Sequence, residues 1–237
     1  MTTFSMSNKP LKKGDRKTPW GKREMTHKRS KRELQVRNLF RIYCEGAVTE
    51  PEYFRAFPIN RRTTKVFAKG YGRSKTSLVE FVVDDLREKH FLIGQKEYDR
   101  DRQNWVVFDF DWKGETNECE DFKSAVTLAE SQGIKAAISN DAFEIWFLLH
   151  FQFVDTRLHR TTVYEKLSEK LGFNYDEVGK QRGISKQLYR TLFPLQANAL
   201  RNARGLAKKM QSIDLCQRNP FTTVHELVVE LNKNLRR

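Results

Sequence analysis

The feature that most constrains this fold is a regular alternation of short β-prone runs and amphipathic segments between residues 38 and 151. The β-prone runs are residues 38–44, 64–69, 105–110 and 134–139; the helical patterns begin at Thr49 and near Ser77 and cover 118–132 and 142–151. Ser77 and Glu80 have the spacing of a capping box, and Gly133 is placed to end the third helix. This order predicts an α/β fold with a mostly parallel four-stranded sheet flanked by helices on both faces.

The chain changes character after residue 153, where helix-start patterns follow one another without a convincing strand between them. Helices are expected to begin near Thr162, Ser185 and Thr223, and Pro194 should interrupt the longest of them. The sequence therefore predicts an α/β core over 38–153 and a helical extension over 154–237 that packs against it.

The positive charge of the chain is concentrated at its N-terminus. Residues 1–37 hold 12 Lys and Arg against three acidic residues, a net charge of +9 out of +14 for the whole chain. This segment has few apolar residues and no periodicity, so it is expected to be a disordered basic tail. Such a tail can neutralise the phosphates of a nucleic acid, or it can simply keep the protein in solution, and charge alone does not choose between these roles.

Cysteine usage and hydropathy indicate the cellular compartment of the protein. The three cysteines, at positions 44, 119 and 216, form neither a metal-ligand spacing nor a disulfide framework, a pattern that suits a reducing cytoplasm. The sequence contains no secretory signal, and no apolar run approaches the roughly 18–20 residues that a membrane helix needs. We therefore expect a cytoplasmic protein that does not contact the membrane.

Acidic residues stand at the predicted ends of two separate strands. Glu45 follows the first strand, and Asp109 and Asp111 lie at the end of the third. Ligands of open α/β sheets bind beyond the carboxyl ends of the strands, and acids two positions apart on a strand point to the same side. Carboxylates so placed suit Mg²⁺, which could activate water and stabilise charge on a phosphodiester. An Asp-x-Asp pair alone is weak evidence, since acids at strand ends often only face solvent, but Glu45 strengthens it.

Four segments resemble the RloB-like proteins, a branch of the Toprim superfamily found in bacterial defence and restriction loci. They are the segments 44–54 (CEGAVTEPEYF), 107–111 (VFDFD), 139–151 (SNDAFEIWFLLHF) and 219–227 (NPFTTVHEL), and they occur in the family's order. Each motif is moderately specific by itself, and the set spans about residues 38–230. The resemblance departs from the family at Asp141, where a proline is expected, so this residue either alters the loop before Glu144 or adds a carboxylate to the site.

The resemblance implies a Toprim-like fold with a glutamate and an Asp-x-Asp pair around Mg²⁺ or Mn²⁺. By position, Glu45 matches the glutamate that often acts as general acid or base in this superfamily, and Asp109 and Asp111 match the metal-binding pair. Members look like nuclease effectors of anti-phage defence, often encoded beside an ATPase partner. The oligomeric state stays open, a homodimer included.

Other acidic residues and a histidine near these motifs have competing interpretations. Glu144 lies in an otherwise apolar helix, where it can be a metal ligand or general base, or the structural partner of a nearby Arg or Lys. Glu50 and Glu52 lie at a helix N-terminus, where carboxylates are favourable in any case, and Glu50 is close enough to Glu45 to reach the metal. His150 fits a core position better than a catalytic one.

Four basic residues are candidates for contacts to a substrate phosphate. Arg73 and Lys75 lie in a Gly-containing loop between a strand and a helix, but the loop lacks the spacing of an ATP-binding phosphate loop. Lys180 and Lys186 are candidates from the extension. For Arg73 and Lys75 an ordinary flexible turn is an equal alternative, whereas for Lys180 and Lys186 a solvated helix face is the commoner interpretation of such lysines.

The sequence thus favours a Mg²⁺-dependent nuclease that cleaves RNA or DNA, with Glu45, Asp109, Asp111 and Glu144 as its catalytic residues. The alternative is a non-catalytic module that binds nucleic acid or an ATPase partner. A fragment of a Toprim polymerase or topoisomerase is disfavoured, because no tyrosine-bearing topoisomerase domain or zinc-binding primase module accompanies the motifs.

Overall fold

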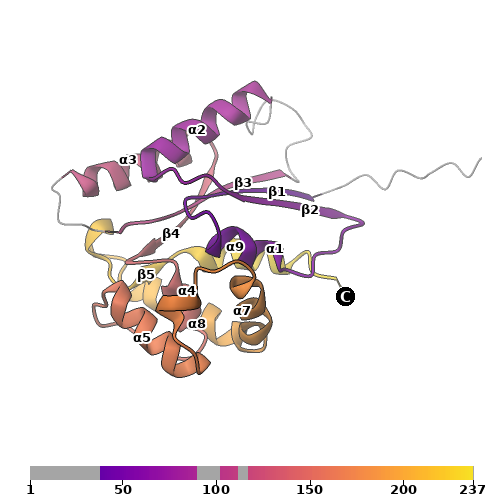
Figure 1. Cartoon of the computed structure of the whole chain (residues 1–237). Coiled ribbons are helices and arrows are strands. Elements are labelled where there is room, and N and C mark those ends of the chain that lie inside the picture. Colours follow the sequence, from indigo (N-terminus) through magenta and orange to yellow (C-terminus); the bar gives the residue numbers. More distant parts are fainter. Residues whose placement is uncertain (1–37, 90–101, 112–116, 237) are drawn as a thin grey trace, which may run out of the picture. The chain divides into compact units, whose positions relative to one another are not determined.

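The computed structural model describes residues 38–89, 102–111 and 117–236, which form one α/β unit (Figure 1). A five-stranded sheet runs through it in the order β2-β1-β3-β4-β5. The strands are β1 (Asn38–Cys44), β2 (Thr64–Gly70), β3 (Arg102–Asp109), β4 (Lys135–Asn140) and β5 (Phe221–Thr222). The first four are parallel, and β5 pairs antiparallel with β4. The predicted α/β fold is confirmed, and it is consistent with a Toprim-like arrangement.

The register of the parallel strands brings their carboxyl ends to one edge of the sheet. Cys44, the last residue of β1, pairs with Val107 of β3 on one side and with Gly70 of β2 on the other. Asp109, the last residue of β3, pairs with Ser139 of β4. Whatever follows β1 and β3 therefore emerges at the same edge.

Helices cover both faces of the sheet (Figure 1). The pair α2 (Lys75–Glu88) and α3 (Glu118–Ser131) packs on one face, while α1 (Thr49–Arg55), α4 (Glu144–Leu148) and α9 (Val224–Asn232) lie on the other with the rest of the extension. None of the described helices is long and apolar enough to cross a membrane.

Two helix-boundary predictions had different outcomes. Gly133 has a left-handed φ of 67° just beyond α3, so the predicted stop is confirmed. The capping box at Ser77 and Glu80 is wrong, because α2 already begins at Lys75, after Ser74 in an extended conformation. Ser77 therefore lies inside the first turn of the helix rather than before it.

The extension is not purely helical, because it adds β5 to the sheet. Its helices are α5 (Arg160–Leu171), α6 (Tyr175–Val178), α7 (Ile184–Leu192), the 3-10 turn η2 (Phe193–Leu195), α8 (Gln196–Lys209), the 3-10 turn η3 (Leu215–Gln217) and α9. Pro194 lies in η2 and separates α7 from α8, as predicted. The prediction of four strands missed β5, since a two-residue strand leaves no periodic pattern in a sequence. The predicted tail, 1–37, lies outside the described residues.

An aromatic cluster joins the core to the extension. The ring of Tyr53 on α1 contacts those of Phe143 and Phe147 next to and on α4, and that of Tyr189 on α7. The indole nitrogen of Trp146 donates a hydrogen bond to the Tyr53 hydroxyl at 2.8 Å. Because these side chains are fully or nearly fully buried, the two parts share one hydrophobic core.

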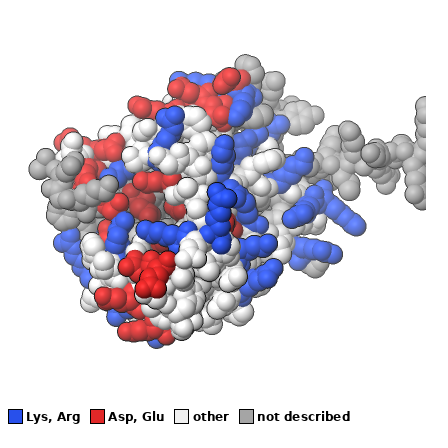
Figure 2. Space-filling model, viewed as in Figure 1, with Lys and Arg blue, Asp and Glu red and all other residues white. Residues whose placement is uncertain are grey.

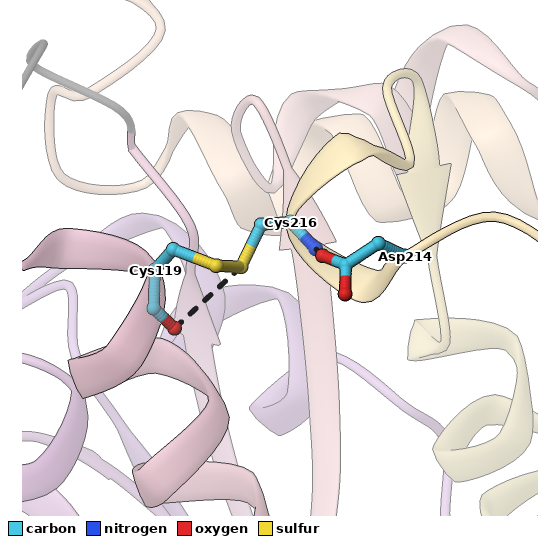
Figure 3. Close-up of side chains that lie close together, drawn as sticks. All are labelled: Cys119, Asp214 and Cys216. Atoms are coloured by element: carbon cyan, nitrogen blue, oxygen red, sulfur yellow. Dashed lines mark hydrogen bonds between the residues drawn. A yellow bond between two sulfur atoms is a disulfide. The ribbon is translucent and has the colours of Figure 1, made fainter. Parts of the chain in front are cut away.

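The structure corrects the expectation that the cysteines do not pair. Cys119, at the start of α3, and Cys216, in η3, form a disulfide across 97 residues of sequence (Figure 3). Cys44 is a buried free thiol. The pairing could not be read from the sequence, because it depends on how the extension folds back to α3.

The disulfide predicts a redox-dependent stability. Reduction, or the substitution Cys119→Ser, should lower the free energy of unfolding by up to about 4–5 kcal/mol, since the bond closes a long loop in the unfolded chain. Urea unfolding of oxidised and reduced protein measures the difference. The Cys44→Ala variant should keep that dependence on reductant. Detection of three thiols, rather than the one expected from Cys44, in the denatured, unreduced protein would contradict the pairing.

Candidate metal centre

Five carboxylates line one cavity of about 330 Å³ at the carboxyl edge of the sheet. Glu45 comes directly after β1, and Asp109 and Asp111 come from the end of β3. Glu50 comes from α1 and Glu144 from the first residue of α4. The three residues predicted as metal ligands thus border a common space, together with two further acids.

Glu45 and Asp109 are held directly against each other. The backbone N–H of Asp109 donates to Glu45 Oε2 at 3.2 Å, and the N–H of Glu45 donates to the carbonyl of Val107 at 2.8 Å. These contacts follow from the parallel pairing of β1 and β3, which brings the two strand ends together. The glutamate is therefore fixed at the tip of the strand that carries the Asp-x-Asp pair.

Asp109 is half-buried, and its two carboxylate oxygens have different surroundings. Its Oδ2 accepts a hydrogen bond from the N–H of Phe143 at 3.0 Å, whereas its Oδ1 is buried with no hydrogen-bond partner among the described residues. Burial raises the pKa of Asp109 well above its usual range, and the nearby carboxylates of Glu50, Glu144 and Glu45 raise it further. An oxygen buried in this way lacks a positive partner.

The pKa of Glu50 is affected by the same neighbouring acids. Burial, followed by the charges of Glu144 and Glu45, raises its pKa to about 7, although hydrogen bonds from backbone N–H groups oppose the shift. One of these comes from Gly46, whose N–H lies 3.2 Å from Glu50 Oε1. A Cβ at position 46 would lie 2.1 Å from Glu50 Oε2, so a glycine is needed for this carboxylate to turn back onto the strand end.

Glu144 is 4% exposed and is held by the extension. The hydroxyl of Tyr175, the first residue of α6, donates to Glu144 Oε1 at 3.1 Å. Burial raises the pKa of Glu144, and the positive charges of Lys180 and Arg160 partly oppose that shift. The Glu144 carboxylate therefore borders the cavity, with a hydroxyl and two cations near it. This position is compatible with a metal ligand or general base and also with a structural partner of Arg or Lys.

The Asp111 carboxylate forms an ion pair with an arginine. Its Oδ1 lies 2.5 Å from Nη2 of Arg160, which is the first residue of α5. Asp141 holds the same arginine: its Oδ2 accepts from the Arg160 backbone N–H at 2.9 Å and lies 3.5 Å from Arg160 Nε. Asp141 is not among the residues that line the cavity, so it anchors Arg160 and does not add a sixth carboxylate.

The residues of the cavity fit a hard divalent cation. The orphaned Oδ1 of Asp109 and the crowding of like charges are both relieved when a cation binds, and carboxylate oxygens are the ligands that Mg²⁺ and Mn²⁺ prefer. The oxygens of the five carboxylates are distributed around the wall of the cavity and do not converge on a single point. Within the described residues, only Cys119, Asp214 and Cys216 place three candidate ligand atoms within 4.8 Å of one another, and the two sulfurs are bonded to each other (Figure 3).

The candidate phosphate ligands differ in their positions. Lys180 lines the acidic cavity, and its Nζ lies 5.5 Å from the ring centre of Tyr164. Lys75 lines an adjoining hollow that also contacts Glu45 and Asp111. Arg73 is exposed, with its guanidinium 4.7 Å from the ring centre of Phe81, and Lys186 is exposed; neither lines the acidic cavity or this hollow.

Glu52 and His150 have structural contacts. Glu52 Oε2 accepts a hydrogen bond from the N–H of Gly183 at 2.7 Å, which ties α1 to the start of α7. His150 is fully buried, its Nδ1 lies 2.9 Å from the carbonyl of Trp146, and it is not among the lining residues of the cavity. The interpretation of His150 as a core residue agrees with this position.

Comparison with known proteins supplies the family. A family model described as RloB-like protein matches residues 40–231. The chain belongs to the RloB-like protein family. The match runs from β1 into α9, so it includes the strands that carry the acids and the extension that covers them. No curated protein and no solved structure matches the chain.

The sequence analysis missed two residues of this RloB-like site, Arg160 and Tyr175. Both come from the extension and reach the acids only through its packing on the core. The one local signal was the position of Arg160 near a predicted helix start, which by itself indicates a solvated side chain. Their contribution could be recognised only from the tertiary structure.

The burial of His150 predicts a contribution to stability that is lost in mild acid, opposite in sign to the contribution of the acids with raised pKa values. Burial lowers the pKa of His150 to about 4, from an ordinary value of 6.5, so below pH 6.5 the unfolded chain takes up a proton that the folded chain refuses. The free energy of unfolding should fall by up to about 3 kcal/mol between pH 6.5 and 4 through this group. The variant His150→Leu should lack this contribution, so the difference in unfolding free energy between parent and variant should change by that amount across the range, measured by urea unfolding. Equal slopes in parent and variant would contradict this origin.

Proposed function

We propose that this RloB-like protein is a Mg²⁺- or Mn²⁺-dependent phosphodiesterase that cleaves RNA or DNA. The observation that carries the proposal is the gathering of Glu45, Asp109 and Asp111 on one cavity with two acids of raised pKa, under two cations of the extension. Acids alone would repel a phosphodiester. Acids that bind a divalent cation, with an arginine and a lysine at the same cavity, can attract one.

The residues divide into three roles. Glu45, Asp109 and Asp111 would hold the metal, which when bound polarises the phosphate and promotes formation of a hydroxide nucleophile. Glu50, with a pKa raised to about 7, can hold or release a proton near neutral pH, as general acid–base catalysis requires, and Glu144, whose pKa is also raised, borders the same cavity. Arg160 and Lys180 would bind the phosphate oxygens, and Tyr175 orients the Glu144 carboxylate.

We propose that the biological role of this nuclease is anti-phage defence, with an ATPase as its partner. The support for this role is the resemblance to the RloB-like proteins alone. Protection by strains that carry the parent or the Asp111→Ala variant separates chemistry from binding. Equal protection would favour the alternative, a module that only binds nucleic acid or the ATPase.

Neutralising the ligands should abolish cleavage while the fold is kept. The variants Asp109→Asn and Glu45→Gln remove the charges that would hold the metal, so hydrolysis of tRNA, single-stranded RNA and plasmid DNA with Mg²⁺ or Mn²⁺ should fall at least about 100-fold. The exposed residues Asp84 and Glu80 of α2 provide matched controls, Asp84→Asn and Glu80→Gln, which should cleave like the parent.

Metal binding can be measured without activity. Mn²⁺ should raise the melting temperature of the parent, because it relieves the repulsion at Asp109, and should raise that of Asp109→Asn much less. Nuclease activity of both ligand variants equal to that of the parent would refute the proposed centre.

Lys180 should contribute to turnover more than to folding. It is exposed and touches the cavity, so Lys180→Ala should keep the melting temperature but lower kcat by roughly ten- to a hundredfold, the effect of losing one charged group at the transition state. Lys186→Ala is the matched control from outside the cavity and should be unchanged. Single-turnover cleavage at saturating metal measures the cleavage rate of both variants. Equal loss in the two variants would show that overall charge, and not position, matters.

A further inference from the structure

Within residues 38–89, 102–111 and 117–236, one face of the edge strand β2 is exposed beside α2. Lys65, Phe67 and Lys69 alternate along it and are exposed, whereas Ala68 between them is buried on the opposite face. Phe67 is 59% exposed, the largest value for any large apolar side chain in the described part of the chain. Edge strands that expose a large apolar side chain are normally protected, so this surface is a candidate binding site.

A groove of about 600 Å³ lies along this strand, and we call it the β2 groove. Its basic side chains are Arg41 on β1, Arg55 on α1, Lys69 on β2 and Lys89 after α2, and Asp85 is its one acid. Asp85 is already engaged by Lys89 and by the Tyr43 hydroxyl, which donates to it at 2.8 Å. Figure 2 shows Lys and Arg gathered on the side of the molecule where β1 and β2 lie. The groove therefore favours an anionic occupant.

The aromatic residues of the groove identify which kind of anion fits. Phe67 presents its ring to solvent, and the Tyr71 ring stacks on that of Tyr43 with centres 5.5 Å apart. Lys69 Nζ lies 5.0 Å from the Tyr71 ring centre. A basic groove with an exposed ring is the arrangement that binds single-stranded nucleic acid, because unpaired bases stack on the ring while the cations follow the phosphates. A duplex keeps its bases stacked and cannot use Phe67 in this way.

The edge itself is poorly suited to a protein strand. Arg55 Nε donates to the carbonyl of Ala68 at 2.8 Å, which occupies a backbone acceptor of β2. Lysines on both sides of Phe67 further oppose the addition of a strand, because such charges protect sheet edges from pairing. Nucleic acid needs no backbone hydrogen bonds from the strand, so these features do not exclude it.

The end of β2, beyond the groove, lies against the end of β1 that carries Glu45. Tyr71 N–H donates to the carbonyl of Cys44 at 3.0 Å, and Gly72 N–H donates to that of Glu45 at 3.1 Å. A Cβ at Gly70 would lie 2.2 Å from the carbonyl oxygen of Gly46, so the end of β2 is packed directly on the loop that carries Glu45. From Phe67 to Gly70 the strand advances only about 10 Å, a distance that a few nucleotides of one strand can cover.

We propose that the β2 groove binds single-stranded nucleic acid, with a base stacked on Phe67 and phosphates on Lys69 and on the exposed Lys65 beside the groove, and directs the strand toward the acidic cavity. Binding in the groove stands independently of catalysis; the direction toward the cavity rests on the proposed nuclease function. The groove then favours substrates long enough to fill both places.

Binding is tested with the full chain in EDTA, by fluorescence anisotropy of labelled single-stranded RNA and DNA 12-mers. Phe67→Ala should weaken binding about tenfold, as expected for one base–ring stack. Lys65→Glu with Lys69→Glu should weaken it as much and flatten its salt dependence. The controls are Phe153→Ala, another exposed phenylalanine, and Arg204→Glu with Lys208→Glu on α8, which should each stay within twofold of the parent.

A second arm separates the groove from the chemistry. With Mn²⁺, groove variants should lose cleavage of oligonucleotides but keep hydrolysis of bis-p-nitrophenyl phosphate, which is too small to reach Phe67. If no substrate is cleaved by any variant, the nuclease proposal fails while the anisotropy result still decides the groove. Unchanged affinity of both groove variants would overturn the inference. A groove variant with a changed molar mass in light scattering and an unchanged affinity for nucleic acid would also overturn the inference. The groove would then be a contact between copies of the chain.

Discussion

The arrangement of the whole structure is constrained by five carboxylates that are kept together at the carboxyl edge of the sheet. Burial raises the pKa values of Asp109, Glu50 and Glu144, and the mutual repulsion of the acids adds to the shift for Asp109 and Glu50. A fold selected for stability alone would avoid such a cluster, since each charge is costly to bury without a partner. The cluster persists because parallel strands deliver their ends to one edge and because other parts of the chain partly offset the negative charge.

The extension supplies that offset. Arg160 contacts Asp111, Tyr175 donates to Glu144, and Lys180 lies over the same cavity. These contacts are possible only because the aromatic cluster around Tyr53 fixes α7 and α4 against α1 in one core. Packing and electrostatics are thus linked, since the helices that bury the acids also bring the cations to them.

The sequence predicted the elements whose patterns are local. The strand ends at Glu45 and Asp109 were recognisable because a short apolar run followed by an acid is a local feature, and parallel pairing then required the two ends to meet. The contributions of Arg160 and Tyr175, the two-residue strand β5 and the Cys119–Cys216 bond were not predictable, because each depends on residues far apart in the chain that meet only after packing. Lys180 shows the intermediate case: its charge made it one candidate among many lysines, and only the fold selected it.

The hydrogen bond from Tyr175 to Glu144 has a consequence for how such proteins can diverge. The cations of the cavity and this hydroxyl are encoded after residue 153, whereas the acids are encoded before it. The two parts of the gene are therefore expected to evolve together. A recombination that exchanged the extension would have to import an equivalent hydroxyl and an equivalent arginine together, or leave buried charge uncompensated. Inheritance of this site is therefore expected to follow the whole chain and not its α/β half alone.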